Sequence, residues 1–281
     1  MTTNNPLTVD NIVYLLNQET YTAEQIMSTI QDDPKRLRLH DYNRLVKRLL
    51  DYFFINYDTS KSYVRDSGFQ GSVILLNEKI KYKWLENFSH IEFSSLYPSI
   101  MTKLWKEGKA NFNIYEFGVM YNFMVENIKN IKSNPNISET GRMLFRFVIN
   151  YTYGASQNQF DRSFISFDSV DKVPIYTKET FEYIMEQNQH NIFYIDVDEI
   201  YLDYVSPEVL SSVKSLGLPF TIENNLNGMF MEKKRCLIQD GNTINPRGLR
   251  ATFRSKYKLE KNRINKLQKI LNKINNVRTT T

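Results

Sequence analysis

The chain has 281 residues, of which 41% are apolar and 24% charged, and its net charge is +5. This length supports a sizeable core in one large or two modest domains, and the composition excludes a disordered chain. Cys236 is the single cysteine, which excludes an intramolecular disulfide and favours a reducing compartment. No apolar run is long enough to span a membrane, and the polar residues 1–5 do not resemble a secretory signal. We therefore expect a soluble, cytoplasmic protein.

Positive charge is concentrated near the C-terminal end. Residues 250–281 contain ten Lys or Arg and one acid, Glu260, so this segment carries +9 and the rest of the chain −4. An acidic body with a basic arm is typical of an enzyme that collects metal ions in one place and phosphates in another. A solvated basic helix at the chain end explains the same pattern equally well.

Apolar periodicity predicts helices over 9–55, where residues 7–10 are typical of a helix start. A polar connector leads to strands at 72–76 and 90–94. Two helices over 115–153 predict a helical hairpin, with Ser138 as the N-cap of the second helix. The later expected elements are a helix around 178–189, a β-hairpin around 192–205, a helix around 207–216, a strand at 228–238 and a final helix over about 257–274. This order predicts an α+β fold with helices on one face of a mostly antiparallel sheet.

Acidic residues interrupt the apolar strands of the predicted hairpin. Asp196 and Asp198 are two positions apart, so they share a strand face or both reach the hairpin tip. Glu92 ends another predicted strand and can supply a third carboxylate across the sheet. Carboxylates on adjacent rigid strands are the ligands that Mg²⁺ prefers, and two such ions suit phosphoryl transfer. An acidic β-turn is the alternative interpretation.

The second helix of the predicted helical hairpin presents a polar face. Arg142, Arg146 and Asn150 are spaced at i, i+4 and i+8, so they lie on one side of the helix. Two cations and an amide suit an incoming triphosphate. The alternative is a basic stripe that faces solvent, although the neighbouring apolar residues leave this helix few exposed positions.

Three segments, in this order and spacing, resemble the polymerase motifs of family B DNA polymerases. They are Glu-Phe-Ser-Ser-Leu-Tyr-Pro-Ser-Ile at 92–100, Asn-Tyr-Thr-Tyr-Gly at 150–154 and Tyr-Ile-Asp-Val-Asp at 194–198, within a resemblance that covers roughly 68–250. The resemblance implies a polymerase palm with a two-helix fingers hairpin and a truncated basic thumb helix. The implied domains are a helical N-terminal region (1–67), the palm (68–114 and 154–250), the fingers (115–153) and a basic tail or partial thumb (251–281).

The resemblance also implies roles for individual residues. Tyr97 would exclude a 2′-hydroxyl, so that the substrate is a dNTP. The implied catalytic and metal-binding residues, for two Mg²⁺ or Mn²⁺ ions, are Glu92, Asp196 and Asp198; the nucleotide-binding residues are Tyr97, Arg142, Arg146, Asn150 and Tyr153; and the DNA-binding residues are Lys233, Lys234, Arg235 and Arg247.

The sequence departs from the family pattern at several of these positions. The family has Asp where Glu92 stands, Lys where Arg146 stands and Tyr where Cys236 stands, and its third motif usually reads Gly-Asp-Thr-Asp-Ser. No Asp-x-Glu pair, the usual exonuclease motif, precedes Glu92. We therefore expect a DNA-directed DNA polymerase or polymerase subunit of phage or viral type, without proofreading. Its partners would be primer-template DNA, dNTPs and a separate subunit with the exonuclease or thumb. The alternative is a degenerate palm that serves as a DNA-binding or scaffold subunit of a replication complex.

Overall fold

The computed structural model describes residues 3–19, 39–61, 74–157, 164–187, 192–232, 235–240 and 243–247. The chain forms two compact units, each assembled from separate stretches of sequence. The helical unit comprises Met1–Gly71, Ser94–Tyr183 and Leu216–Pro219, and the sheet unit comprises Ser72–Phe93, Ile184–Ser215 and Phe220–Thr281. In the described part of the chain, no helix is both long and apolar enough to cross a membrane.

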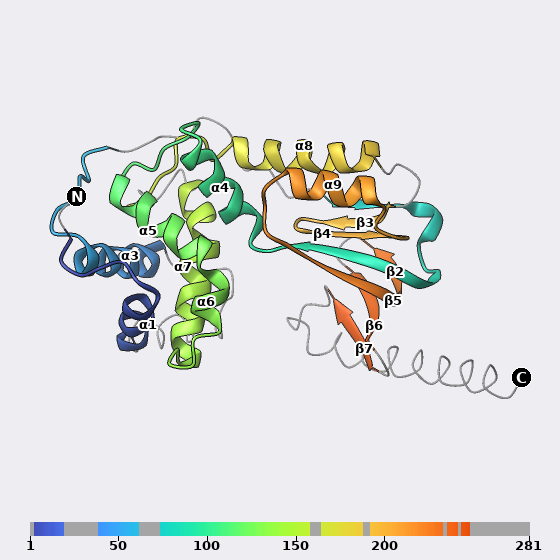
Figure 1. Cartoon of the computed structure of the whole chain (residues 1–281), viewed down its shortest axis with the longest axis horizontal. Coiled ribbons are helices and arrows are strands. Elements are labelled where there is room, and N and C mark those ends of the chain that lie inside the picture. Colours follow the sequence, from blue (N-terminus) through green and yellow to red (C-terminus); the bar gives the residue numbers. More distant parts are fainter. Residues whose placement is uncertain are drawn as a thin grey trace, which may run out of the picture. The chain divides into compact units, whose positions relative to one another are not determined.

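The sheet unit is built on one seven-stranded sheet in the order β1-β3-β4-β2-β5-β6-β7 (Figure 1). Every neighbouring pair of strands is antiparallel, and helix α9 lies along the sheet. The α+β fold with a mostly antiparallel sheet is therefore confirmed. The bounds are β1 Ile74–Leu76, β2 Trp84–Phe93, β3 Ile192–Asp196, β4 Glu199–Leu202, β5 Phe220–Glu232, β6 Arg235–Asp240 and β7 Thr243–Arg247, with a short 3-10 helix at Glu78–Ile80 and α9 at Pro207–Ser215.

The two faces of this sheet differ in chemistry. One face carries fully buried aliphatic side chains, among them Ile91, Ile195 and Ile200. The other carries an aromatic cluster, in which Tyr201 and Phe230 pack at 5.1 Å between ring centroids. The members of this cluster are Phe88, Tyr194, Tyr201, Phe230, Cys236 and Ile238. Side chains alternate between the two faces of the sheet along a strand. Residues two or four positions along a strand from these aromatic residues therefore lie on the same face, nearer the strand ends.

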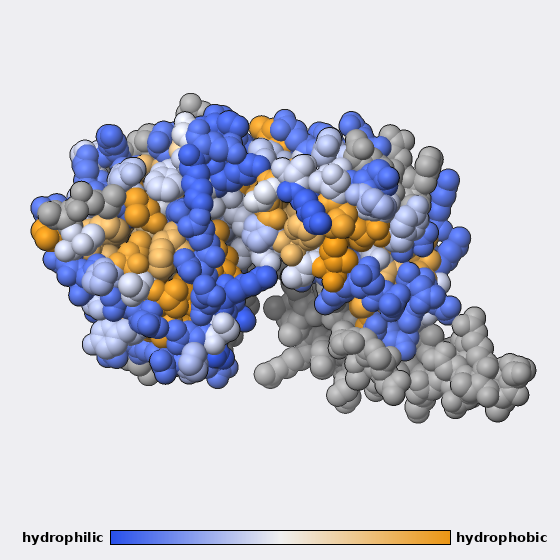
Figure 2. Space-filling view, in the orientation of Figure 1, coloured by the Kyte–Doolittle hydropathy of each residue, from blue (hydrophilic) through white to orange (hydrophobic). Residues whose placement is uncertain are grey.

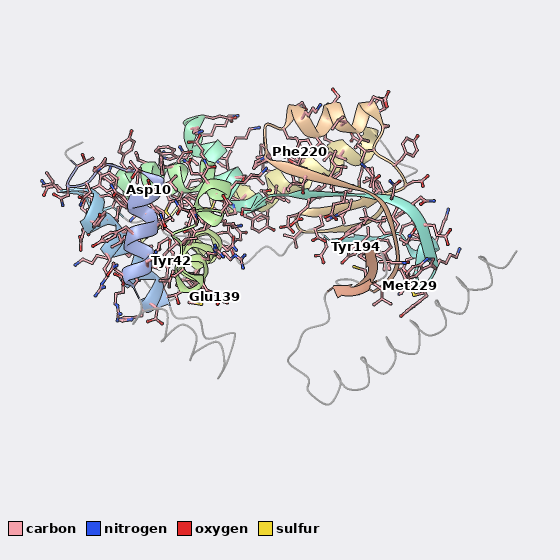
Figure 3. The ribbon with its side chains drawn as sticks, turned by 60° about the horizontal axis from the view of Figure 1, so that its bottom comes forward. Asp10, Tyr42, Glu139, Tyr194, Phe220 and Met229 are labelled. Atoms are coloured by element: carbon pink, nitrogen blue, oxygen red, sulfur yellow. The ribbon has the colours of Figure 1, made fainter. Side chains whose placement is uncertain are left out.

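The helical unit is organised around α7, Glu139–Gln157. The Tyr42 hydroxyl of α3 lies 2.8 Å from the Thr152 hydroxyl, and the Tyr121 hydroxyl of α5 donates to the Ile149 carbonyl at 2.8 Å. Figure 3 labels Tyr42 and Glu139, the first residue of α7, in this unit. The bounds of the other helices are α1 Val9–Gln18, α3 Leu39–Phe53, α4 Leu96–Lys106, α5 Tyr115–Glu126, α6 Ile128–Lys132 and α8 Lys172–Gln187.

Two predicted helix starts are confirmed by their capping bonds. The Thr8 hydroxyl accepts from the Asn11 N–H at 3.2 Å, and the Ser138 hydroxyl accepts from the Gly141 N–H at 2.9 Å. Each bond satisfies an N–H group that the first helical turn leaves without a backbone acceptor.

Other elements differ from the prediction. The first arm of the helical hairpin is broken at Asn127 into α5 and α6, and β2 is followed by α4, which was not among the predicted helices. The helix expected at 178–189 begins earlier, at Lys172. The final basic helix over 257–274 lies outside the described residues.

The face of the molecule shown in Figure 2 is mostly hydrophilic, with apolar patches between the polar side chains. Large apolar or aromatic side chains that are exposed include Tyr14, Tyr115 and Tyr204. Scattered exposure of this kind is ordinary for a folded domain and does not by itself mark a binding surface.

Candidate active site

Three acids form a row across adjacent strands of the sheet. Glu199, the first residue of β4, lies opposite Asp196 of β3 on one side and opposite Glu92 of β2 on the other. Directly opposed side chains on one sheet face have their Cβ atoms roughly 4.5–5.5 Å apart, and like charges at such positions are destabilising. The fold therefore holds a concentration of negative charge at this end of the sheet.

The turn between β3 and β4 places Asp198 next to this row. The Asp198 N–H donates to the Asp196 carbonyl at 2.7 Å, which closes a γ-turn, and the Phe93 N–H donates to the Asp198 carbonyl at 2.8 Å. The second bond ties the hairpin tip to the end of β2, beside Glu92. Asp198 is thereby fixed to the backbone of two different strands.

Val197, at the centre of this turn, has a φ of 58°. A left-handed backbone is rare for a β-branched residue and stores strain, as does a γ-turn of this sense. Such strain persists only where the surroundings determine the conformation. Here it is held by the antiparallel pairing on both sides of the turn.

The surroundings of Asp198 disfavour its charge. The pKa of the Asp198 carboxyl is raised from 3.8 to about 6, chiefly by burial and next by the charge of Glu199, with smaller contributions from Glu92 and Asp196 and an opposing effect of its own backbone N–H. Asp198 therefore lies within electrostatic reach of three other carboxylates. A group of this kind is stabilised by a bound cation, which converts the repulsion into attraction.

Tyrosine hydroxyls hold two of these carboxylates. The Tyr194 hydroxyl donates to Asp196 Oδ2 at 2.9 Å, and the Tyr201 hydroxyl donates to Glu199 Oε2 at 2.6 Å. Both tyrosines belong to the buried aromatic cluster, and Figure 3 labels Tyr194 in the sheet. The two tyrosines are fixed within the aromatic cluster and therefore orient the carboxylates of Asp196 and Glu199.

The acidic side chains of this row are not already arranged as a complete set of metal ligands. Within the described ranges, no three His, Cys, Asp or Glu side chains are gathered closely enough to enclose an ion. The backbone positions nevertheless fit a hard divalent cation, because four oxygen-bearing side chains start from three adjacent strands and one turn. Mutual repulsion keeps such carboxylates apart until a cation neutralises them, so side-chain rotation would complete the site.

In the helical unit, α7 presents the polar face expected from the sequence. Arg142, Arg146 and Asn150 are all exposed, whereas Phe145 and Val148 on the other faces are fully buried. The three exposed side chains form no ion pair or hydrogen bond with the residues that the structure describes. They remain available to an anionic ligand.

Tyr97 and Tyr153 lie together in the helical unit. Their rings meet edge-on with centroids 4.5 Å apart, so the second residue of α4 contacts the last turns of α7. Gly154, the next residue, is exposed, and a β-carbon there would meet no atom within 4 Å. The structure thus brings together the tyrosines of the first two motifs, beside an open stretch of backbone.

The predicted DNA-binding residues are described only in part. Lys233 and Lys234 lie outside the described residues. Arg235 begins β6 and Arg247 ends β7, and the backbone of Arg247 pairs with that of Cys236. Cys236 itself is buried in the aromatic cluster, so it is part of the core of the sheet unit.

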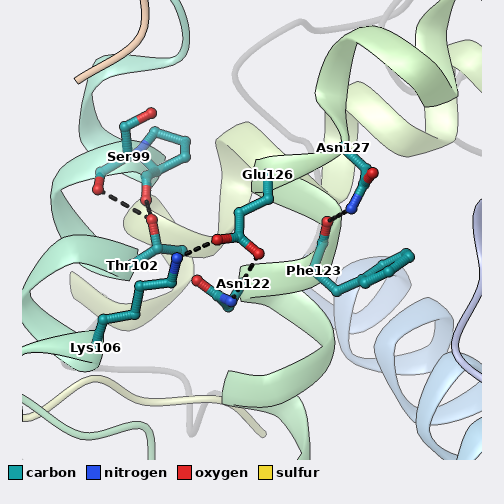
Figure 4. A network of polar contacts seen from close by, with 8 residues as sticks. Ser99, Thr102, Lys106, Asn122, Phe123, Glu126 and Asn127 are labelled. Atoms are coloured by element: carbon teal, nitrogen blue, oxygen red, sulfur yellow. Dashed lines mark hydrogen bonds and ion pairs between the residues drawn. The ribbon is translucent and has the colours of Figure 1, made fainter. Parts of the chain in front are cut away.

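A pocket of about 690 Å³ lies within the helical unit, between α4, the α5–α6 break and residues 217–219. An ion pair between Lys106 and Glu126 joins α4 to α5 at its edge (Figure 4). Lys103 is also engaged, because its Nζ donates to the Leu216 carbonyl at 2.5 Å. Lys129 at the rim forms no ion pair with described residues, so it is the cation that this pocket leaves available.

Two residues of the site were not predicted from the sequence. These residues are Glu199 and His90. The available signal was the period-two spacing of His90 with Glu92 and of Glu199 with Tyr201, which places all four on one sheet face. Their contact across strands depends on the pairing register, which the sequence does not reveal.

Neither a comparison with protein-family models nor one with curated proteins finds a match for this chain. Among solved structures, the chain is similar to phi29 DNA polymerase complexed with primer-template DNA, at 11% identity and a TM-score of 0.50. It is similar to the same polymerase complexed with single-stranded DNA, at 12% identity and a TM-score of 0.51. Each alignment covers 82% of this chain and 63% of the phi29 chain.

The chain is also similar to the family B DNA polymerase from the hyperthermophilic archaeon Pyrobaculum calidifontis, at 16% identity and a TM-score of 0.47. That alignment covers 75% of this chain and 32% of the archaeal chain. The chain therefore spans less than two thirds of the length of each polymerase. At these identities the phi29 comparisons show a DNA polymerase-like fold, with a palm-like sheet flanked by helices.

Proposed function

We propose that this chain is a DNA-directed DNA polymerase of family B type, or the polymerase subunit of one, which adds dNTPs to the 3′ end of a primer. The observation that carries the proposal is the row of Asp196, Glu199 and Glu92 across three strands, with Asp198 tied to its end. The polymerase-like fold and the ordered sequence motifs support the same reaction.

The sheet unit would supply the metal site. Glu92, Asp196 and Asp198 would hold two Mg²⁺ ions, for which Mn²⁺ can substitute, because hard cations take carboxylate oxygens. When bound, the metals would activate the primer hydroxyl and neutralise the triphosphate. The γ-turn and the aromatic face keep these carboxylates on rigid backbone, and this positioning is the contribution of the protein.

The helical unit would supply the nucleotide contacts. Arg142, Arg146 and Asn150 would hold the triphosphate through charge-assisted hydrogen bonds, and Tyr97, supported by Tyr153, would lie against the sugar. The primer 3′ oxygen forms its new bond to the α-phosphorus, and the bond to pyrophosphate breaks. Lys233, Lys234, Arg235 and Arg247 would contact the duplex backbone without sequence preference.

A second function, a DNA-binding scaffold with a degenerate palm, is favoured by one observation. Asp196 and Glu199 are engaged by tyrosine hydroxyls, and the described part of the chain holds no ready metal cage. A scaffold would bind duplex DNA through its basic segments and would not need Asp198.

Primer extension separates the two functions. The full chain is incubated with primed template and dNTPs, first with Mg²⁺ and then with Mn²⁺, and compared with Asp198→Ala and with Asp203→Ala as a matched control. Asp203 is an exposed acid just after β4. Extension that is lost only in Asp198→Ala supports the polymerase. Duplex binding without extension under either metal would contradict it and support the scaffold.

A further inference from the structure

Glu199 occupies the centre of the acidic row. It is the one acid of the row with an acidic neighbour on both sides, Asp196 and Glu92. The family resemblance gives this position no role, since the third motif usually ends in serine there. A partly buried carboxylate at this place needs an explanation of its own.

Two side chains lie close to the carboxylate of Glu199. The Tyr201 hydroxyl donates to Glu199 Oε2 at 2.6 Å, and His90 Nε2 lies 3.9 Å from the same oxygen. His90 is 1% exposed, and its Nε2 has no hydrogen-bond partner in the described structure, although it points at the acidic row. A buried polar atom without a partner is uncommon and calls for an explanation, such as an ion or a water bound beside it.

His90 itself is fixed in orientation. Its ring stacks on Tyr201 at 4.4 Å between centroids with an angle of 12°, and its Nδ1 lies 3.2 Å from Glu223 Oε2. The series Glu223, His90, Tyr201 and Glu199 therefore runs from the surface of the sheet to the acidic row. Groups that orient a ligand in this way are typical of the outer shell of metal sites.

We propose that Glu199 is a further ligand of the divalent metal, and that Tyr201 and His90 are its positioning residues. The inference rests on the proposed function, since it concerns the same metal site. The inference also bears on Glu92, whose side chain is longer than that of the family's Asp. Glu199 lies opposite Glu92 on the adjacent strand and would supply an additional oxygen ligand. If Glu199 were only a structural partner of His90, the removal of its charge would leave metal affinity unchanged.

The test measures the binding of Mn²⁺ alone to the metal-free full chain, from the loss of the free Mn²⁺ signal in electron paramagnetic resonance. The variants are Glu199→Gln, which keeps the side-chain shape, and Tyr201→Phe, which removes only the hydroxyl. Asp203→Asn is the control for a nearby loss of charge, and Asp198→Ala reports on the proposed site. Circular dichroism of each metal-free variant checks the fold.

We expect Glu199→Gln to weaken Mn²⁺ binding about 10- to 100-fold and Tyr201→Phe about tenfold, with Asp203→Asn unchanged. A further variant, Glu199→Ala, leaves room for a water molecule to replace the lost oxygen ligand on Mn²⁺. The relaxation rate of water protons per bound Mn²⁺ should therefore rise in this variant. If Glu199→Gln misfolds, the Tyr201→Phe result decides.

Two outcomes would overturn the inference, and they are distinguishable. Mn²⁺ binding that depends on Asp198 but is unaffected in Glu199→Gln and Tyr201→Phe would refute the role of Glu199 and leave the proposed function intact. A wild-type chain that does not bind Mn²⁺ would remove the proposed metal chemistry, and the role of Glu199 with it.

Discussion

Removal of the charge at the hairpin tip should stabilise the metal-free protein. The pKa of the Asp198 carboxyl is raised from 3.8 to about 6, chiefly by burial and then by Glu199. Between these values the folded state binds the proton more tightly than the unfolded state does. The Asp198 carboxyl therefore contributes its full stabilisation below about pH 4, and this contribution is lost as the pH rises through about 6.

The size of the effect follows from the shift. A rise from 3.8 to about 6 corresponds to ~3 kcal/mol between the two protonation states. Asp198→Asn is neutral at every pH and keeps the shape of the side chain. At pH 7 and without metal, the variant should be more stable than the wild type by up to ~3 kcal/mol, and the fall in its stability between about pH 4 and 6 should be smaller by the same amount.

Fluorescence of a single tryptophan gives a local assay. The chain has two tryptophans, Trp84 in β2 and Trp105 in α4, so a Trp105→Phe background leaves Trp84 as the reporter of the sheet unit. Urea unfolding is followed with EDTA at several pH values, and Asp203→Asn controls for the loss of an exposed charge. With Mn²⁺ at a thousand times Kd the order should reverse, because only the wild type gains binding energy, about 4.1 kcal/mol.

A particular result would refute this reasoning. If Asp198→Asn is no more stable than the wild type at pH 7 and shows the same dependence on pH, then Asp198 does not carry the repulsion that the structure indicates. The repulsion within the acidic row would then be relieved in solution by other groups.

Three further substitutions test other parts of the structure. Val197→Gly should raise the free energy of unfolding by about 1 kcal/mol, because glycine adopts a φ of 58° without strain; equal or lower stability in urea titration would contradict the strained turn. Gly228→Ala should lower stability by roughly 1–3 kcal/mol or more, since its β-carbon would overlap the Leu237 carbonyl oxygen between β5 and β6; an unchanged urea midpoint would rule out this close packing. Arg146→Met should weaken dNTP binding about tenfold or more in filter assays and leave stability within about 0.5 kcal/mol, as its exposed side chain suggests, whereas unchanged dNTP affinity would count against the nucleotide face of α7.

Local signals in the sequence were sufficient for several elements. Ser138 caps α7, and the apolar strands on either side of Asp196 and Asp198 form the expected β-hairpin, because capping and period-two alternation depend on near neighbours. The helix α4 was not among the predicted elements, and its start contains Pro98. This proline stands in the first helical turn, where a missing N–H breaks no helical hydrogen bond.

Long-range pairing explains what the sequence could not supply. Strand β2 begins earlier than predicted, and the single strand predicted at 228–238 is wrong, because this stretch is divided between β5 and β6. Both β2 and β5 contain polar residues and register shifts that interrupt the alternation near Phe88. The position of Glu199 between Asp196 and Glu92 depends on the register of strands about a hundred residues apart. The domain boundaries and the roles of the site residues remain predictions.

The place of β2 in the sheet has a consequence for synthesis. Its two neighbours are β4 and β5, and Glu92 pairs with Glu199 and Thr221, so both partners are made more than a hundred residues after it. At roughly 5–20 residues per second on the ribosome, both edges of this strand wait for about 5–30 s without their native partners. Open strand edges are templates for intermolecular pairing. The strand that carries Glu92 is therefore a place where the nascent chain is exposed to aggregation. The yield of folded protein should depend on how fast the following helical segment is translated and on chaperones that shield these edges.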